Sequence, residues 1–221
     1  MYTTKELYEV NHSLASSYLF SFTYPYEALD GIKDLILSLG KDIGEDYLEV
    51  KENVWIHKSA TVAPTAFIAG PAIIGDGTEI RHCAFIRGSA IIGKGCVIGN
   101  SVELKNVIIS DSVQVPHFNY VGDSILGYKA HMGAGSLTSN VKSDKTLVSI
   151  KDCNGIRVET NRKKVGAFIG DYSEIGCNTV LNPGTVIGRN SIIYPGQSVR
   201  GIVPSYSIYK SNNNIVNRED R

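Results

Sequence analysis

One aliphatic residue recurs at every sixth position along two long stretches of the chain. In the first stretch these residues are Ile56, Val62, Ile68, Ile74, Ile80, Ile86, Ile92, Ile98 and Leu104. In the second they are Ile169, Ile175, Leu181, Ile187, Ile193 and Val199. An amphipathic helix repeats its apolar positions every three or four residues and a half-buried strand every two, so neither produces this spacing. A six-residue period is typical of the hexapeptide β-solenoid.

A second regular position lies four residues after each aliphatic residue of the first stretch. It holds a small or β-branched residue, as at Ala60, Ala84 and Cys96, and glycine often follows the aliphatic residue directly, as at Gly75 and Gly93. We interpret the aliphatic side chain as pointing inward, the small residue as fitting near a corner, and glycine as permitting the turn. Three hexads would complete one triangular coil, with coils stacked about 4.8 Å apart by parallel strand pairing. The pattern therefore predicts an all-β parallel β-helix.

The period shifts in the middle of the chain. After Leu104 it resumes at Ile109, continues to Val121, and shifts again to Leu126 and Met132. Such shifts indicate coils of irregular length, and irregular coils are where a solenoid often carries its function. We therefore expect the chemistry of this protein in these irregular coils.

Residues 1–50 lack the hexad pattern. We expect a helix within residues 4–22 and a second that begins at Pro25 and ends at Gly40, because proline suits the first helical turn and glycine the end. Its apolar face consists of Leu29, Ile32, Leu35, Ile36 and Leu39. We predict that residues 1–50 form a small N-terminal helical cap over the open end of the solenoid, whose strand edges would otherwise be unpaired.

Residues 51–205 are expected to form the solenoid, and residues 139–165 interrupt its repeat. Within the interruption, residues 146–151 and 156–160 flank Asn154-Gly155, which is a hairpin turn signal. We therefore predict a protruding arm that ends in the basic residues 162–164. The polar residues 206–221 are expected to be a frayed tail.

The composition narrows the setting. Lys and Arg together number 22, as do Asp and Glu, so charge gives no reason to expect nucleic acid as a partner. No apolar run approaches the roughly 20 residues of a membrane span, and the N-terminus lacks the apolar region of a signal peptide. The cysteines at positions 83, 96, 153 and 177 form no CxxC motif or paired framework. We expect a reduced, cytoplasmic protein that contacts neither membrane nor nucleic acid.

Candidate chemistry lies in residues 114–123, a polar and aromatic segment that contains His117. An imidazole titrates near neutrality and can accept a proton from an attacking amine, although spacing alone equally fits a structural surface histidine. Arg87 and Lys105 lie 18 residues apart, which is one full coil, so they should stack on one outward edge beside Glu103. Two stacked cations can hold a phosphate, and a solvated charged edge is the alternative.

Three segments carry a resemblance to a known family: residues 86–105, 116–123 and 132–140. They resemble the C-terminal acetyltransferase domain of the bifunctional enzymes that combine glucosamine-1-phosphate N-acetyltransferase with UDP-N-acetylglucosamine pyrophosphorylase. The archaeal sugar-phosphate nucleotidylyltransferases look most similar, including residues 166–170, and the resemblance covers roughly residues 55–205. It implies left-handed coils, although crossover connections are usually right-handed. It also implies a homotrimer with sites between subunits.

The resemblance further implies an acetyl-CoA-dependent N-acetyltransferase that acts on an amino-sugar 1-phosphate. In that reading His117 is the general base, and Glu103 orients or polarises it. The remaining roles implied are sugar-phosphate binding by Arg87 and Lys105, an acceptor pocket lined by Tyr120, Asn140 and Lys164 of the same or a neighbouring subunit, and acetyl-CoA binding along Ala134, Cys177 and Pro195. The free amine would attack the thioester directly, so Cys177 is not assigned as a nucleophile. No metal site is predicted, and a role for Mg²⁺ stays open.

Two positions near the acceptor depart from the family pattern. The bacterial domain has Asn where this chain has His131, and Tyr where it has Val141, which leaves the identity of the sugar open. The family's pyrophosphorylase domain, with its Gly-rich nucleotide loop, has no counterpart in this sequence, so we expect no uridylyl transfer from this chain.

Two other functions compete with this reading. The first is a non-catalytic, sugar-nucleotide-binding relative of the pyrophosphorylases. The second is a zinc enzyme like the γ-class carbonic anhydrases, with His82, His117 and His131 as candidate ligands, but the closely spaced histidine pair of that class is missing.

Overall fold

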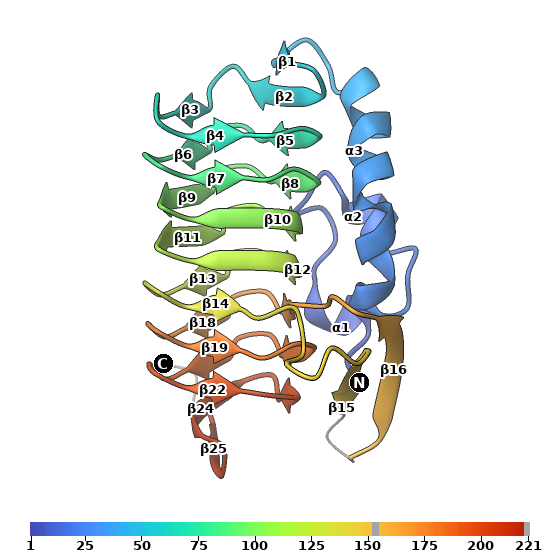
Figure 1. Ribbon diagram of the computed structural model, residues 1–221, viewed down its shortest axis with the longest axis vertical. Helices are drawn as coiled ribbons and strands as arrows, with labels where there is room; N and C mark the ends of the chain where they lie inside the picture. Colours follow the sequence, from blue (N-terminus) through green and yellow to red (C-terminus); the bar gives the residue numbers. More distant parts are fainter. Residues whose placement is uncertain (152–154, 219–221) are drawn as a thin grey trace.

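Short parallel strands stack in coils around one long axis (Figure 1). The computed structural model describes residues 1–151 and 155–218. The prediction of an all-β solenoid is confirmed, and its coils have three faces joined by tight turns. The first face contains β2 (Val54–His57), β5 (Ala72–Ile74), β8 (Ala90–Ile92), the second halves of β10 (Glu103–Ile109) and β12 (Tyr120–Leu126), β17 (Ala167–Ile169), β20 (Thr185–Ile187) and β23 (Ile202–Val203). We call it the helix-covered face.

The other two faces have no helices against them in Figure 1. The site face contains β4 (Phe67–Ile68), β7 (Phe85–Ile86), the first halves of β10 and β12, β14 (Leu137–Thr138), β19 (Val180–Leu181) and β22 (Ser198–Val199). The groove face contains β3 (Thr61–Val62), β6 (Glu79–Ile80), β9 (Val97–Asn100), β11 (Gln114–His117), β13 (His131–Met132), β18 (Glu174–Ile175), β21 (Ile192–Ile193) and β24 (Ser207–Ser211).

Strand register shows where the coils change length. Val54 pairs with Ala72 and Ala72 with Ala90, so the first coils take 18 residues. Ala90 pairs with Val107 and Val107 with Ser124, so the next two take 17. These shorter coils hold residues 103–123 and confirm the shift seen in the sequence. The following coil spans 43 residues, from Ile125 to Phe168, because it contains the inserted arm.

The inward residues of the hexads fill the interior. Those from Ile74 to Leu104, and those of the second stretch, are at most 1% exposed and form one continuous core. Each fully buried aliphatic side chain contributes about 1.5–3 kcal/mol relative to its exposed state. Ile56 and Val62 are only partly buried, because they lie in the first coil.

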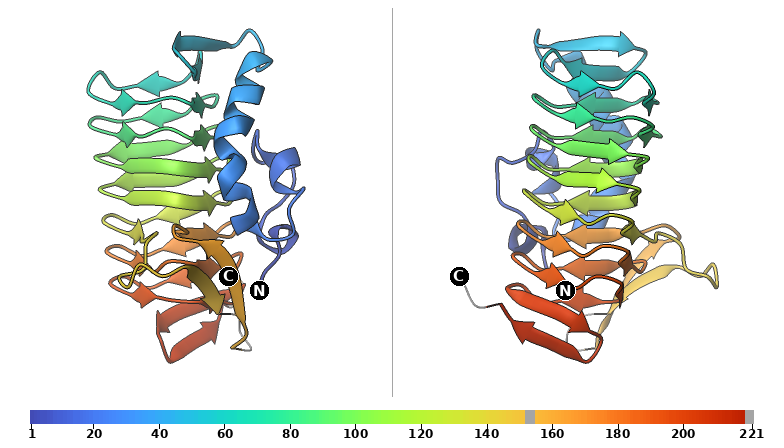
Figure 2. Two further views of the ribbon diagram at one scale, coloured as in Figure 1. Left: turned by 45° about the vertical axis from the view of Figure 1, so that its right-hand side comes forward. Right: turned by 90° about the vertical axis from the view of Figure 1, so that its left-hand side faces the viewer.

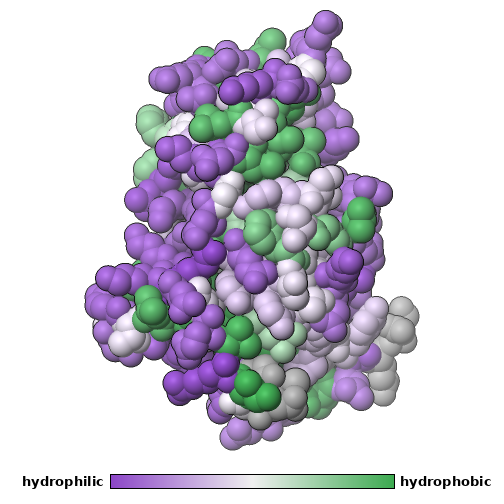
Figure 3. Space-filling view, turned by 90° about the vertical axis from the view of Figure 1, so that its right-hand side faces the viewer, coloured by the Kyte–Doolittle hydropathy of each residue, from purple (hydrophilic) through white to green (hydrophobic). Residues whose placement is uncertain are grey.

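The helices lie along the side of the solenoid, so the prediction of a cap over its open end is wrong (Figure 1). They are α1 (Thr4–Leu7), α2 (Ser16–Leu19), the 3-10 helix η1 (Pro25–Gly31) and α3 (Ile32–Lys41). They bury the outward ladder Ile73, Ile91, Ile108, Ile125, Phe168 and Val186. Burial of this second apolar set determines where the helices pack. Seen from outside, this side of the molecule is mainly hydrophilic with separate hydrophobic patches (Figure 3).

Gly40 belongs to α3 and does not end it, contrary to the prediction. A Cβ atom at this position would lie 2.4 Å from the ring of Trp55, so glycine allows the helix to contact the first coil. The open edge of that coil is instead paired by β1 (Tyr47–Lys51), which runs antiparallel to β2.

The other end of the solenoid also finishes in a hairpin. Strand β25 (Asn214–Asn217) pairs antiparallel with β24, so most of the tail that we predict to be frayed is ordered. Backbone pairing supplies that order, although all four side chains of β25 are exposed.

The inserted arm contains the predicted hairpin (Figure 2), formed by β15 (Val148–Lys151) and β16 (Arg157–Arg162). Asn154 of the predicted turn lies outside the described residues. The strands do not protrude freely, because Val148 and Ile150 are buried in the same cluster as the helices. Arg162 forms an ion pair with Asp30, which joins the arm to the helical layer.

Candidate active site

Four of the predicted residues line up on one edge, at the turns that follow the strands of the groove face. The amide of Gly135 donates to the carbonyl of His117 at 3.0 Å, that of Asn178 to Ala134 at 2.8 Å, and that of Gly196 to Cys177 at 2.8 Å. These bonds place His117, Ala134, Cys177 and Pro195 on successive coils. We call this set the His117 edge. The structure therefore places the predicted base in line with the predicted acetyl-CoA-binding residues.

His117 is exposed. Its turn is stabilised by Asn119, a residue that the sequence did not lead us to predict. The Asn119 side chain is buried; its Oδ1 accepts from the backbone N–H of His117 at 3.0 Å, and its Nδ2 donates to the carbonyls of Gly133 at 2.8 Å and Ser136 at 2.9 Å. Among the described residues, the His117 ring nitrogens have no hydrogen-bond partner. The imidazole is thus fixed at its backbone and free at its ring.

The predicted phosphate-binding residues stack as expected. Leu104 pairs with Ile86, and the amide of Arg87 donates to the carbonyl of Leu104 at 2.8 Å, which puts Arg87 and Lys105 on neighbouring coils of the site face. Glu103 lies with them and accepts a hydrogen bond from Arg87 at 2.7 Å. Among the described residues, no contact joins Glu103 to His117. The Glu103 carboxylate, which we predict to orient the base, is paired with Arg87 instead.

Tyr120 and Asn140 meet directly. Glu103 pairs with Tyr120 across β10 and β12, and Asn140 Nδ2 donates to Tyr120 Oη at 3.1 Å. Burial raises the pKa of Tyr120, and the nearby negative charges of Asp123 and Glu103 act in the same direction. The phenol therefore stays protonated at neutral pH and keeps its O–H as a donor.

Asp123 lies at the centre of this cluster. It is 5% exposed and accepts from Asn106 Nδ2 at 2.9 Å and Asn140 Nδ2 at 2.6 Å, with Lys105 Nζ at 3.7 Å. One pattern in the sequence could have indicated Asp123: residues 106, 123 and 140 are Asn, Asp and Asn at 17-residue spacing.

Lys164 follows the arm directly. Its neighbour Val165 donates its amide to the carbonyl of Asn140 at 3.0 Å, so the backbone of Lys164 lies close to the cluster. The Lys164 side chain is exposed, and among the described residues it has no ion-pair partner. The chain therefore brings the backbone of Lys164 near the predicted pocket, while its side chain stays exposed.

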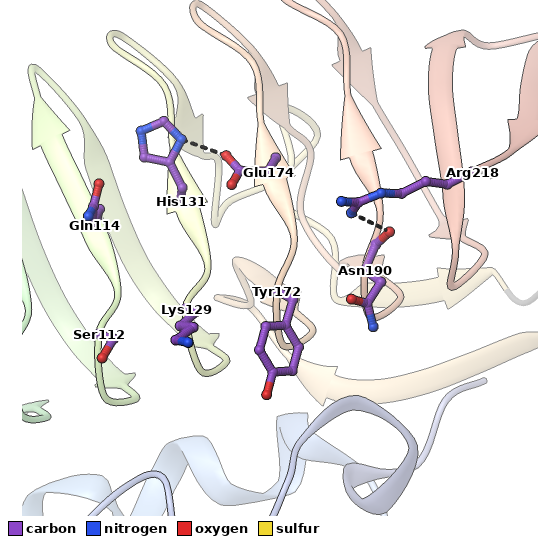
Figure 4. Close-up of a pocket in the computed structure, with 8 residues that line it drawn as sticks. All are labelled: Ser112, Gln114, Lys129, His131, Tyr172, Glu174, Asn190 and Arg218. Carbon is purple, nitrogen blue, oxygen red and sulfur yellow. Dashed lines mark hydrogen bonds and ion pairs between the residues drawn. The ribbon is translucent and has the colours of Figure 1, made fainter. Parts of the chain in front are cut away.

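A groove of about 580 Å³ lies on the groove face (Figure 4). Its lining residues are Ser112, Gln114, Lys129, His131, Tyr172, Glu174, Asn190 and Arg218. The ring of His131 and the carboxylate of Glu174 point toward each other, with Nδ1 2.8 Å from Oε2. None of the residues predicted for the acetyltransferase site lines the groove, whereas His131, a candidate ligand in the zinc alternative, does. It shares strands β11 and β13 with the His117 edge, since Gln114 lies three residues before His117.

The three histidines of the zinc alternative do not form a site. His82 and His117 lie two coils apart on one edge, and His131 pairs with Glu174 on the groove face. Within residues 1–151 and 155–218, no group of three or more His, Cys, Asp or Glu side chains is placed to hold a metal ion. The same part of the chain contains no helix with the length and apolar character needed to cross a membrane.

Comparison with known proteins gives matches over both halves of the solenoid. A family model described as the GMPPB C-terminal domain matches residues 68–163, and one described as bacterial transferase hexapeptide (six repeats) matches residues 166–196. Among solved structures, the acetyltransferase domain of PglB from Neisseria gonorrhoeae, in complex with acetyl coenzyme A, is 15% identical with a TM-score of 0.30, covering 86% of this chain and 66% of that one.

Curated relatives match over longer segments. A bifunctional sugar-1-phosphate nucleotidylyltransferase/acetyltransferase of Sulfurisphaera tokodaii is 33% identical over 179 residues, which is 79% of this chain and 44% of the relative. A bifunctional protein GlmU of Methanococcus maripaludis is 34% identical, covering 79% of this chain and 42% of the relative. The chain thus spans less than half the length of these relatives. It belongs to the hexapeptide-repeat family of acyltransferases and is related to the bifunctional sugar-1-phosphate nucleotidylyltransferase/acetyltransferases.

Proposed function

We propose that the protein is an acetyl-CoA-dependent N-acetyltransferase that acts on an amino-sugar 1-phosphate, with His117 as the general base. One observation carries the proposal: the His117 edge borders the same face that carries the cluster of Arg87, Lys105 and Tyr120. His117 and Tyr120 are only three residues apart in the chain, at the end of β11 and the start of β12. A sugar held by its phosphate at the cluster would place its amine toward the imidazole.

The reaction needs one proton acceptor and one oxyanion stabiliser. The amine nitrogen forms a bond to the thioester carbonyl carbon, the carbon–sulfur bond breaks, and the amine proton passes to the free ring nitrogen of His117 and then to the departing CoA sulfur. Backbone N–H groups along the edge would stabilise the oxyanion. The product is an amide, and no acyl-enzyme forms.

The cationic residues would bind the phosphate. Lys105 supplies a positive charge. Arg87 donates one N–H group to Glu103 and has further N–H groups that can donate to the phosphate. The Tyr120 hydroxyl is available as a further donor. We assign Glu103 to positioning Arg87, since Arg87 is the residue that it contacts.

We propose a homotrimer in a reducing compartment. Phe67 and Phe85 of the site face are 59% and 41% exposed and contact each other edge-to-face, with ring centroids 5.8 Å apart. A neighbouring copy would cover these rings and bring a second Lys164 to the open pocket. Sedimentation equilibrium measures the mass of the protein in solution, and the mass of a monomer would contradict the proposed trimer.

Cys83 and Cys177 are exposed free thiols, which suit a cytoplasmic protein.

A thiol-release assay tests the activity. Acetyl-CoA is offered with glucosamine 1-phosphate, galactosamine 1-phosphate and other amino-sugar 1-phosphates, and UTP turnover is followed in parallel. We expect CoA release with at least one amino-sugar 1-phosphate. We expect no turnover of UTP. If the protein bound amino-sugar phosphates but released CoA with none of them, the result would instead support the non-catalytic, sugar-nucleotide-binding alternative.

A further inference from the structure

We infer that Asp123 is a positioning residue that sets the hydrogen-bond polarity of the acceptor pocket. This inference rests on the proposed function. Its buried carboxylate holds Lys105 and turns the Asn140 amide so that the carbonyl oxygen, and not the NH₂ group, faces the ligand. The assignment goes beyond the residues that contact substrate in the proposal, because Asp123 acts through its neighbours.

The first observation is a ladder of three polar residues. Lys105 pairs with Gly122 in register, so the next positions, Asn106 and Asp123, stack on consecutive coils, and Asn140 lies one coil further along the chain. Asn106 and Asp123 both have a positive φ, at 53° and 48°, a conformation that Asn and Asp tolerate better than most residues. The ladder therefore occupies a corner where an Asn or an Asp would each fit.

The second observation shows why the middle position holds an acid. An Asn there could still bond to both neighbours, because one amide can both donate and accept. Only a carboxylate accepts hydrogen bonds on both oxygens. Here Oδ1 accepts from Asn106, and Oδ2 accepts from Asn140 and lies near the Lys105 ammonium group. The negative charge thus serves Lys105 and fixes the orientation of two amides.

The third observation extends this polarity to the ligand. Asn140 Nδ2 donates to both Asp123 Oδ2 at 2.6 Å and Tyr120 Oη at 3.1 Å, so both amide hydrogens are used. The side-chain oxygen Oδ1 of Asn140, which has no hydrogen-bond donor among the described residues, remains as an acceptor for a hydroxyl or amine. The Tyr120 oxygen already accepts, so its proton is left for an anionic group. Asp123 therefore leaves an acceptor at Asn140 and donors at Tyr120 and Lys105, which suits an amino sugar that carries a phosphate.

The root of the arm joins the same corner. Gly166 donates its amide to the Asp123 carbonyl at 2.8 Å, beside the bond from Val165 to Asn140. A Cβ atom at Gly166 would lie 2.1 Å from the carbonyl oxygen of Gly122, so this close approach requires glycine. Asp123 thus links the phosphate-binding residue, the acceptor-binding amide and the segment that follows Lys164.

The test compares Asp123→Asn with Asp171→Asn. Asp171 is also a buried acid that accepts from two donors, but it lies under the N-terminal segment. For Asp123→Asn we expect the KM for the sugar phosphate to rise about 10-fold or more, with the KM for acetyl-CoA within about 2-fold and a nearly unchanged melting temperature. Asp171→Asn should leave both KM values unchanged. An unchanged acceptor KM in Asp123→Asn would overturn the inference, as would a general loss that follows the melting temperature.

A second measurement does not depend on activity. Lys105 is labelled with an amine-reactive ester in the wild type and in Asp123→Asn, with exposed Lys94 as the internal reference. We expect Lys105 to react faster in the variant, because it has lost its carboxylate. Equal Lys105 rates would overturn the inference even in a protein that acetylates sugars. Faster Lys105 labelling in a protein that acetylates no sugar would refute the proposed function and leave the Asp123–Lys105 link standing.

Discussion

The helix-covered face and the site face share strands β10 and β12 but differ in their outward residues. In β10, Leu104 and Ile109 both point into the core and are fully buried. The outward residue on the helix-covered face, Ile108, is buried under the helices, whereas Glu103 on the site face is partly exposed and paired with Arg87. The comparison teaches that inward positions specify the coil on every face, while outward positions decide whether helices pack on a face or polar side chains stay exposed there.

The largest expected effect is on stability. Ile108→Ala should lower the free energy of unfolding by about 2–5 kcal/mol, because it removes a fully buried side chain from the contact with the helices. Phe85→Ala, a larger truncation at an outward position of the site face, should cost about 1 kcal/mol or less in the monomer, because that ring is 41% exposed. Urea unfolding at low protein concentration measures both. Equal costs would remove the distinction between the two faces.

The next effect is on turnover. His117→Ala should lower kcat by about 10² or more, because it removes the proposed proton acceptor, with no change in melting temperature. His82→Ala is the matched control: it lies two coils away on the same edge and bonds to Thr65. If the His117 variant retained the wild-type rate, the assignment of the base would be wrong.

A pH effect on stability should arise at Asp171, on the helix-covered side. Burial raises the pKa of Asp171 to about 6, although the amides of Glu9 and Tyr128 and the charge of Arg189 oppose it. The folded state then binds this proton more tightly than the unfolded state. Between about pH 4 and 6 this residue should therefore make stability fall as the pH rises, by up to about 1.4 kcal/mol per unit.

Asp171→Asn should remove that slope, since the amide does not titrate. The measurement is urea unfolding of both proteins from pH 4 to 7. Parallel stability curves for the two proteins would contradict the expectation.

A smaller effect should appear in acceptor binding. Lys105→Ala should raise the KM for the sugar phosphate about 10-fold with a lesser change in kcat, because we propose that the lysine binds the phosphate and not the reacting atoms. Lys94→Ala, at an exposed turn outside the cluster, is the control. A fall in kcat at unchanged KM would place Lys105 in the chemical step instead.

The hexad period was sufficient to predict the coils, their inward residues and the stacking of Arg87 with Lys105. It could not place the helices, because Ile73 and Ile91 stand next to inward isoleucines in continuous apolar pairs, and the period does not distinguish an outward apolar residue that a helix covers. Asn119 and Asp123 were missed for another reason. Their burial depends on coils of 17 residues, which bring donors from neighbouring coils to one corner. The partner of Glu103 depended on side-chain direction, which spacing does not give.

The most direct test of the His117 edge as the acetyl-CoA site is protection of its cysteine. Cys177 and Cys83 are both exposed, but Cys177 lies between Ala134 and Pro195, whereas Cys83 lies two coils from His117 in the opposite direction. The two thiols are alkylated in the same sample with and without saturating CoA, and the rates are read by mass spectrometry. The account predicts that CoA slows alkylation of Cys177 about 10-fold or more while Cys83 reacts at its original rate. Equal rates at Cys177 with and without CoA would contradict it.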